Sequence, residues 1–257
     1  MIVERVRYST LKHIGRSPAH YLHAVTSERE DSGPMRIGRL VHQHILGAMP
    51  DDEDGAIVVY DGERKGNVWK EFAALHAGCD IVTRKEYDAA LPIASAVRHN
   101  AQAMSLIDGA RCEQPLLWSA GGRAMSSRPD AYRPGGALMD LKTTNDSSPA
   151  AFQRQIMKMA YHAQAAMYQD ALASLGIVTT GAFLVAVETK APYPVTVFEL
   201  APSMLDLGRR TYRGWLETLR TCEESDQWVE YAQTVVRVDV PEWFAVEADD
   251  EGEEVAA

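Results

Sequence analysis

Residues 126–142 read SSRPDAYRPGGALMDLK and contain the pattern that decides the fold. In a β-strand, residues i and i+2 share a face, so Asp140 and Lys142 should project together from one strand. Asp130 stands ten residues before Asp140, at the end of a second strand-like run, and the intervening Arg133-Pro134-Gly135-Gly136 is typical of a tight turn. The pattern therefore predicts a hairpin that sets Asp130 beside Asp140.

Such a pair of carboxylates has a specific chemical use. Together with the backbone carbonyl of Leu141, the two aspartates would supply the oxygen ligands that Mg²⁺ prefers, with Mn²⁺ as a substitute. Lys142 would then position or activate the attacking water and offset charge on a phosphate. An isolated Asp-x-Lys is more often an exposed ion pair. Here the triplet follows the apolar run Ala137-Leu138-Met139, which favours a buried strand and a functional site.

A long helix is predicted directly after this strand. Ser147-Ser148-Pro149 combines a serine cap with proline at the first helical position, so we expect one helix running to about Leu175. Tyr161, Gln164 and Tyr168 would share one face of it. A glutamine on such a helix needs a partner, which is either a site residue or an ordinary core contact.

Four motifs now stand in order: Gly38 to His42, Arg128-Pro129-Asp130, Asp140-Leu141-Lys142, and Gln164 to Tyr168. This set resembles the PD-(D/E)xK nuclease superfamily, in the branch with a Q-x-x-x-Y helix, as in RecB-type nucleases. Over nearly the whole chain, the sequence is similar to phage and prophage exonucleases that resemble the C-terminal domain of RecE, exodeoxyribonuclease VIII. The resemblance implies an α/β (α+β) fold with a restriction-endonuclease-like core, in which helices flank a mixed central β-sheet.

The resemblance also implies an activity and a wider site. It implies a Mg²⁺-dependent exonuclease that degrades linear double-stranded DNA from 5′ to 3′ and leaves 3′ overhangs for phage-type recombination. His42 and Glu113 would complete the metal site, while Gln164 and Tyr168 would orient Lys142, the motif strand or the substrate phosphate. Relatives form rings, so a trimer or tetramer is expected, with an annealing protein of the RecT type as a further partner.

Two alternatives stay open from the sequence. The motifs specify hydrolysis without specifying polarity, so a RecB-like endonuclease or a single-strand DNase is possible. A noncatalytic DNA-binding or scaffold protein could also keep the fold, although the intact acidic and lysine motifs argue against it.

The charge distribution bears on DNA binding more than the net charge of −10 does. From residue 241 onward there are seven acids and no Lys or Arg, so the preceding 240 residues carry −3. Residues 1–44 hold seven Arg or Lys against four acids. Basic residues near the motifs could meet a phosphate backbone. The candidate DNA contacts are Arg123, Arg128, Arg154, Lys158 and Tyr161.

Length and composition bound the domain organisation. With 257 residues and 46% hydrophobic content, we expect a single domain over residues 1–247. It would comprise a helical part (1–110), a catalytic core (111–200) and a C-terminal helix with an extension (201–247). Residues 248–257 form an acidic tail that we expect to be disordered.

The composition of the chain argues against a membrane protein and against an iron–sulfur protein. Because the chain has no apolar run of about 18 residues and no signal-peptide core, we expect a soluble protein in the cytoplasm of a bacterial host cell, with no membrane partner. Cys79, Cys112 and Cys222 lack C-x-x-C spacing, which argues against an iron–sulfur cluster.

Local signals predict most of the remaining elements. Thr83 and Glu86 form a capping box that should open a helix over residues 84–100. Gly121-Gly122 should join strands 114–119 and 123–131. Further elements are expected as helices over 35–46 and 203–223 and as strands over 56–60, 181–189 and 193–200.

Overall fold

The structure is a computed structural model that describes residues 4–27, 31–47 and 56–240. The predicted acidic tail therefore lies outside the described residues. Within the described ranges, no helix is both long and apolar enough to cross a membrane.

A five-stranded sheet forms the centre of the molecule, in the order β10-β9-β8-β7-β4. Strands β8 and β9 are parallel, whereas the other neighbouring pairs are antiparallel, so the sheet is mixed as predicted. The strands span Arg111–Cys112 (β4), Ala131–Tyr132 (β7), Ala137–Thr144 (β8), Gly181–Glu188 (β9) and Val195–Glu199 (β10). The turn between β7 and β8 contains Gly135 at φ 71°, a conformation that glycine adopts without strain.

A three-stranded sheet lies beside the central sheet, in the order β1-β6-β5. Its strands span Val6–Arg7 (β1), Leu116–Ala120 (β5) and Arg123–Ser127 (β6), and Gly121-Gly122 makes the predicted turn. The prediction of one strand over 123–131 was wrong, because β6 ends at Ser127 and β7 begins at Ala131. Pro129 lies in this break and has no N–H for a strand ladder.

Two helices, α7 (Pro149–Lys158) and α8 (Tyr161–Ser174), replace the predicted single helix over 147–175. Ala160 separates them in a left-handed conformation, with φ 53° and ψ 36°. Its carbonyl accepts a hydrogen bond of 2.6 Å from the hydroxyl of Tyr8, the first residue of α1 (Tyr8–Leu11). The predicted helix was wrong because a contact from the distant N-terminal segment supports this break.

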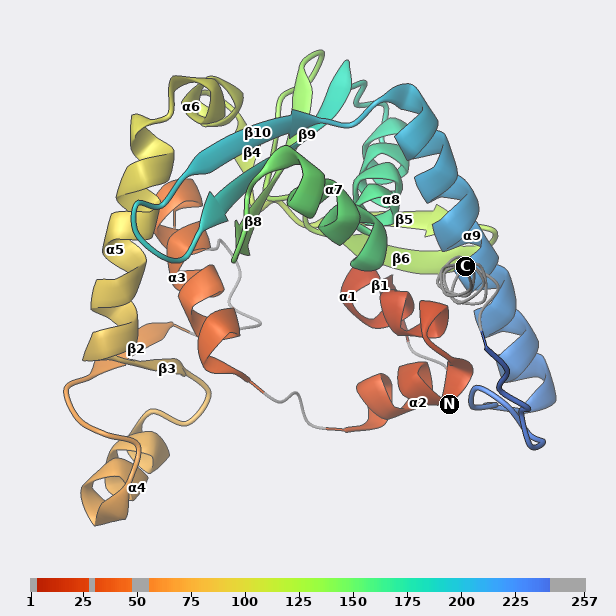
Figure 1. Ribbon diagram of the computed structural model, residues 1–257, viewed down its shortest axis with the longest axis horizontal. Coiled ribbons are helices and arrows are strands. Elements are labelled where there is room, and N and C mark those ends of the chain that lie inside the picture. The colour runs from red at the N-terminus through yellow and green to blue at the C-terminus, as the bar shows by residue number, and fades with distance from the viewer. Residues whose placement is uncertain (1–3, 28–30, 48–55, 241–257) are drawn as a thin grey trace, which may run out of the picture.

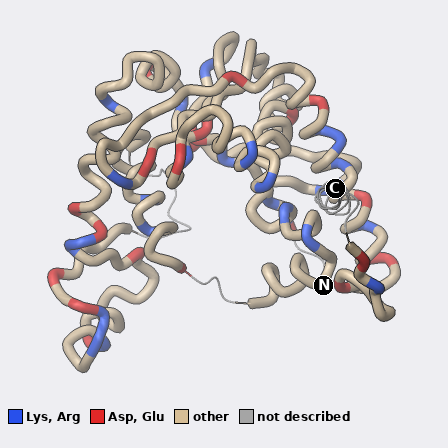
Figure 2. Tube along the Cα trace, viewed as in Figure 1, with Lys and Arg blue, Asp and Glu red and all other residues tan. Residues whose placement is uncertain are grey.

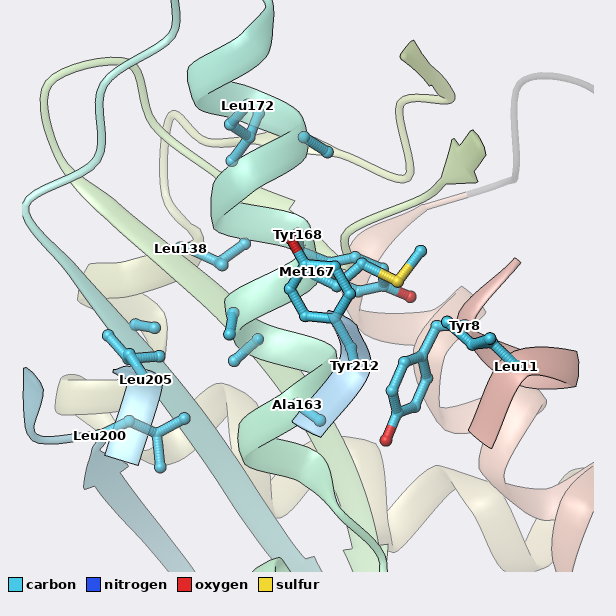
Figure 3. Close-up of a cluster of buried hydrophobic side chains, with 14 of the residues drawn as sticks. Tyr8, Leu11, Leu138, Ala163, Met167, Tyr168, Leu172, Leu200, Leu205 and Tyr212 are labelled. Atoms are coloured by element: carbon cyan, nitrogen blue, oxygen red, sulfur yellow. The ribbon is translucent and has the colours of Figure 1, made fainter. Parts of the chain in front are cut away.

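Helix α8 packs against α9 (Pro202–Ser225), whose bounds agree with the predicted helix over 203–223. Gly208 permits the close approach, because a Cβ atom there would lie 2.2 Å from the carbonyl oxygen of His162. Figure 3 shows Met167 and Tyr168 of α8 beside Tyr212 of α9, with Tyr8 close by. One hydrophobic core thus joins the N-terminal segment, α8 and α9.

A second core lies on the other side of β8 and β9. Helix α5 (Arg84–His99) packs there against α3 (Gly33–Leu46), and its predicted capping box is confirmed. The other elements of this side are β2 (Ile57–Tyr60), α4 (Gly66–Leu75), β3 (Asp80–Thr83) and α6 (Ala101–Ile107).

Figure 1 shows these elements arranged as an arch around the central sheet. Helices α3, α4 and α5 with the β2–β3 pair form one arm. The other arm comprises α1, the 3₁₀ turn Lys12–Gly15, α2 (Pro18–Thr26) and α9.

Candidate active site

Strand β8 carries the two motif residues at the centre of the site. Asp140 is buried, with 3% of its surface exposed, and its carboxylate forms an ion pair with Lys142 Nζ. Both side chains project from the same face of β8, as their i, i+2 spacing requires. Lys142 Nζ also donates a hydrogen bond of 3.0 Å to Gln164 Oε1 on α8.

Asp130 reaches the same strand from the break between β6 and β7. Its Oδ2 accepts hydrogen bonds from the backbone N–H of Leu141, at 2.6 Å, and from His42 Nε2, at 2.9 Å. The N–H and C=O groups of one strand residue point to the same edge of the strand. The Leu141 carbonyl therefore points to the edge of β8 that Asp130 occupies.

His42 lies on α3 with both ring nitrogens engaged. Nδ1 lies 2.8 Å from the carbonyl of Gly38, which can only accept, so Nδ1 carries a proton. Burial opposes a charged ring, but the charge and hydrogen bond of Asp130 outweigh it and raise the pKa of His42 to about 9. His42 is thus an imidazolium paired with Asp130, and its predicted role as a metal ligand stays a prediction.

Glu113 follows β4 in a strained backbone conformation, with φ 51°. Its N–H donates to the backbone carbonyl of Asp130 at 3.1 Å, and its Oε2 lies 3.3 Å from Arg128 Nε. Burial, together with the charge of Asp130, raises the pKa of Glu113 to about 7. Left-handed non-glycine residues are often found at functional sites, which fits the predicted role of Glu113.

The carboxylate of Asp140 is the clearest candidate ligand for a cation. Neither of its carboxylate oxygens, both fully buried, has a hydrogen bond of normal geometry among the described residues, although Oδ2 touches Lys142 Nζ. Burial and the charge of Asp130 raise the pKa of Asp140 to about 6, despite Lys142 and His42. A divalent cation would give these two oxygens the partner that no hydrogen-bond donor of the described residues supplies.

The donor set fits such a cation in its chemistry. Asp130, Asp140 and the Leu141 carbonyl are hard oxygen donors, which suit Mg²⁺ with water in its other positions. In the described part of the chain, no three His, Cys, Asp or Glu side chains form a metal-binding group by themselves. The backbone carbonyl and solvent would therefore have to complete the coordination.

Helix α8 supplies the side chains that surround Lys142. Gln164 Nε2 donates to the Tyr168 hydroxyl at 3.1 Å, while its Oε1 accepts from Lys142, so the glutamine has the polar partners expected for it. Lys142 Nζ lies 4.7 Å from the centroid of the Tyr161 ring. Burial opposes the charge on Lys142, but Asp140 and Asp130 outweigh it and hold its pKa above the ordinary value.

Most of these residues line a cavity of about 720 Å³, while Asp140 and Leu141 lie behind its wall. Its wall includes Lys142, Asp130, His42, Glu113, Arg128, Tyr161, Gln164 and Tyr168. It also includes residues that were not among the predicted site residues: Arg5, Arg7, Tyr8, Lys12 and Arg39. Figure 2 shows Lys and Arg positions gathered where β1 and α1 lie in Figure 1. The sequence signal for Arg5, Arg7 and Lys12 was the excess of basic residues in positions 1–44, and Arg39 lies within the Gly38–His42 motif.

Three predicted DNA contacts do not line this cavity. Arg123 forms an ion pair with Glu223 and lines a larger cavity of about 930 Å³, next to α9 and the β5–β6 hairpin. Arg154 and Lys158 are exposed on α7, outside the lining of the 720 Å³ cavity. The larger cavity lacks the motif residues, so the smaller one is the candidate active site.

The family of the chain follows from a match over most of its length. Residues 8–237 match the model of a family described as "PDDEXK-like domain of unknown function (DUF3799)". The chain belongs to this family. This PDDEXK-like domain carries the pattern of the family name as Pro129-Asp130 and Asp140-Leu141-Lys142, and the hydrogen bond from Leu141 N–H to Asp130 joins the two parts.

Solved structures support the same fold. The PDDEXK-like domain is similar to a protein from Eubacterium rectale named "Putative exonuclease", with 13% identity, a TM-score of 0.64, and coverage of 98% of this chain and 94% of the other. This likeness shows the fold alone. No curated protein matches the sequence.

Two further structural matches have TM-scores too low to carry an argument. A phage-related exonuclease from Haemophilus somnus 129PT has 11% identity and a TM-score of 0.38, with 87% of this chain and 96% of the other covered. An alkaline exonuclease from Laribacter hongkongensis has 16% identity and a TM-score of 0.31, with 51% and 69% covered.

Proposed function

We propose that this PDDEXK-like domain is a metal-dependent nuclease that hydrolyses DNA. The observation that carries the proposal is the buried Asp140 carboxylate, which lacks normal hydrogen bonds among the described residues and pairs with Lys142. Lys142 and Asp130 line a cavity whose wall also holds Arg5, Arg7 and Lys12. A phosphodiester is the substrate class that such a site fits, because the acids can hold a cation and the basic residues can hold phosphates.

Each motif residue then has a distinct task. Asp130, Asp140 and the Leu141 carbonyl would hold Mg²⁺, or Mn²⁺ in its place. The chemistry that such a cation would supply is a lower pKa for a bound water, which makes that water a better nucleophile. Lys142 positions or activates the water and offsets negative charge on the phosphate. His42 holds Asp130, and Glu113 borders the same cavity.

The finer proposal is a 5′-to-3′ exonuclease on linear double-stranded DNA that leaves 3′ single-stranded overhangs for recombination. The motif set supports an exonuclease, as does the structural likeness to the E. rectale protein that is named a putative exonuclease. We further propose that the protein forms a ring of three or four copies in the cytoplasm of a bacterial host and cooperates with an annealing protein of the RecT type.

Three DNA substrates test this proposal. Linear duplexes labelled at either the 5′ or the 3′ end should be compared with a closed circular duplex, all with Mg²⁺. Early release of the 5′ label, with the circle intact, is the expected result. Cleavage of the circle would show an endonuclease, and preference for denatured DNA would show a single-strand DNase.

The noncatalytic alternative predicts a different result. A scaffold protein would bind the duplex without cutting any substrate in Mg²⁺ or Mn²⁺. Light scattering on the same preparation would measure its mass in solution and so test the proposed ring, because a monomer would contradict it.

A further inference from the structure

The ring of Tyr161 covers the ammonium group of Lys142. Lys142 Nζ lies 4.7 Å from the ring centroid, within the range in which a cation is attracted to an aromatic face. Tyr161 is half-buried in the wall of the active-site cavity. The ammonium thus has an aromatic neighbour in addition to Asp140 and Gln164.

A chain of hydrogen bonds fixes this ring relative to the strand that carries Lys142. Thr144, two residues along β8, donates through Oγ1 to Gln155 Oε1 at 2.8 Å. Gln155 Nε2 in turn donates to the Tyr161 hydroxyl at 3.3 Å. Strand β8 therefore contacts Tyr161 at two points, once through Lys142 and once through Thr144 and Gln155.

The break between α7 and α8 sets the direction of the ring. Ala160 has φ 53°, and Tyr161 is the first residue of α8 directly after it. The Ala160 carbonyl accepts hydrogen bonds from Ala163 N–H at 2.9 Å and from the Tyr8 hydroxyl at 2.6 Å. A continuous helix through this point would change the direction in which Tyr161 leaves the backbone.

We propose that Tyr161 is a positioning residue that holds the Lys142 ammonium at the reacting phosphate through its aromatic face. This role differs from the DNA contact predicted from the sequence. The hydroxyl of Tyr161 accepts a hydrogen bond from Gln155, and a face of the ring lies against Lys142, so the described contacts of this side chain hold it against β8. The catalytic consequence rests on the proposed nuclease function, whereas the positioning of Lys142 does not.

A matched pair of variants separates the ring from the hydroxyl. Tyr161→Phe keeps the aromatic face and loses the bond to Gln155, while Tyr161→Leu removes the face. A third variant, Gln155→Leu, loosens the ring without replacing it and serves if Tyr161→Leu does not fold. Circular dichroism and thermal unfolding would establish which variants are folded.

The position of Lys142 can be measured without any activity. Protons held over an aromatic face resonate upfield, so the ε-methylene signal of Lys142 should be displaced in protein labelled with ¹³C-lysine. Lys142→Arg assigns the signal, and the exposed Lys158 on α7 provides an undisplaced reference. Tyr161→Phe and Gln155→Leu lose the same hydrogen bond and keep the ring, so we expect the displacement to decrease to a similar extent in both and to vanish in Tyr161→Leu.

DNA cleavage supplies the second readout. Tyr161→Leu should lower kcat about tenfold, with KM changed less than about twofold, and Tyr161→Phe should stay within about threefold of wild type. An unchanged Lys142 signal in Tyr161→Leu would overturn the proposal, as would a rise in KM with kcat unchanged, which is the mark of a DNA contact. If wild-type protein cuts no DNA, the proposed function fails, and the lysine signal still decides the positioning.

Discussion

His42 Nε2 lies 2.9 Å from Asp130 Oδ2, although 88 residues separate the two in the sequence. Because His42 Nδ1 also donates to Gly38, the ring is protonated and presents a positive charge to the carboxylate. The pair joins α3 to the β6–β7 break, on which Asp130 stands. The geometry of one proposed metal ligand therefore depends on a helix from the N-terminal part of the chain.

Replacing His42 should lower the stability of the protein as well as its DNA cleavage. In His42→Ala, Asp130 stays buried with less compensating charge, and we expect the free energy of unfolding to fall by about 1–3 kcal/mol. His44→Ala, on the same helix, should cost less than about 1 kcal/mol, because His44 Nε2 has no hydrogen-bond partner to lose among the described residues. Urea unfolding in EDTA measures both. Equal losses in the two variants would contradict the account.

The basic wall of the cavity predicts where DNA is held. Arg5 and Lys12 line the cavity, whereas Arg154 and Lys158 do not. An Arg5→Ala/Lys12→Ala double variant should weaken duplex binding and reduce its salt dependence by about one unit of slope for each phosphate that is no longer neutralised. The matched Arg154→Ala/Lys158→Ala variant should bind like wild type. Fluorescence anisotropy over a series of salt concentrations measures the duplex affinity of both double variants. If the Arg154→Ala/Lys158→Ala variant lost more affinity than the Arg5→Ala/Lys12→Ala variant, the DNA would bind along α7 and not along the cavity.

The contact between α8 and α9 should tolerate no added side chain at Gly208. A Cβ atom there would lie 2.2 Å from a backbone oxygen of α8, so Gly208→Ala must push the helices apart at a cost of about 1–3 kcal/mol. Gly214, on the same helix, has nothing within 4 Å of the equivalent position. Gly214→Ala should therefore stabilise the protein by up to about 1 kcal/mol. If thermal unfolding showed that both variants change the stability in the same direction, this packing would be contradicted.

The ion pairs of Glu86 should make the stability of the protein depend on pH. Burial opposes its ionisation, but Arg64, the Thr83 backbone and Arg36 outweigh it and lower the pKa of Glu86 from 4.5 to about 2. The stability from this carboxylate is therefore complete above about pH 4.5 and is lost as the pH falls toward 2. Glu86→Gln should lower the free energy of unfolding by about 1–2 kcal/mol at pH 7, after allowance for solvent screening.

The pH series itself provides the check on Glu86. The difference between wild type and Glu86→Gln should narrow between pH 5 and pH 3. The exposed Glu71 of α4 offers a matched control, since Glu71→Gln should change little across the series. A difference that stayed constant with pH would show that charge is not what Glu86 contributes.

Much of the fold and part of the candidate site could be predicted from local sequence patterns. Asp140 and Lys142 could be placed on one strand face because strand geometry depends only on neighbouring residues. The Thr83–Glu86 capping box could be recognised for the same reason. The contact of Asp130 with β8 was predictable because Asp130 directly precedes β7, and a short turn joins β7 to β8 as a hairpin.

Long-range contacts explain what the sequence did not reveal. The break between α7 and α8 falls at Ala160, where no glycine or proline marks the end of a helix. The Tyr8 hydroxyl that donates to the Ala160 carbonyl lies 152 residues away in the sequence. Arg123 was placed near the site because it precedes Arg128 closely, yet five residues of strand span about 16 Å. The excess of basic residues near the N-terminus was visible, but composition does not say which cavity Arg5 and Lys12 face.

The central claim is that Asp130 and Asp140 hold a cation that drives DNA hydrolysis, and Asp140→Asn tests it most directly. The variant keeps the shape of the side chain and removes its charge. One Mg²⁺ titration should follow two quantities, the thermal midpoint and the rate of nucleotide release from linear duplex DNA. We predict that Mg²⁺ raises the midpoint and starts cleavage in wild type and does neither in Asp140→Asn. Cleavage by Asp140→Asn at the wild-type rate, or wild type that is indifferent to Mg²⁺ and EDTA, would contradict the account.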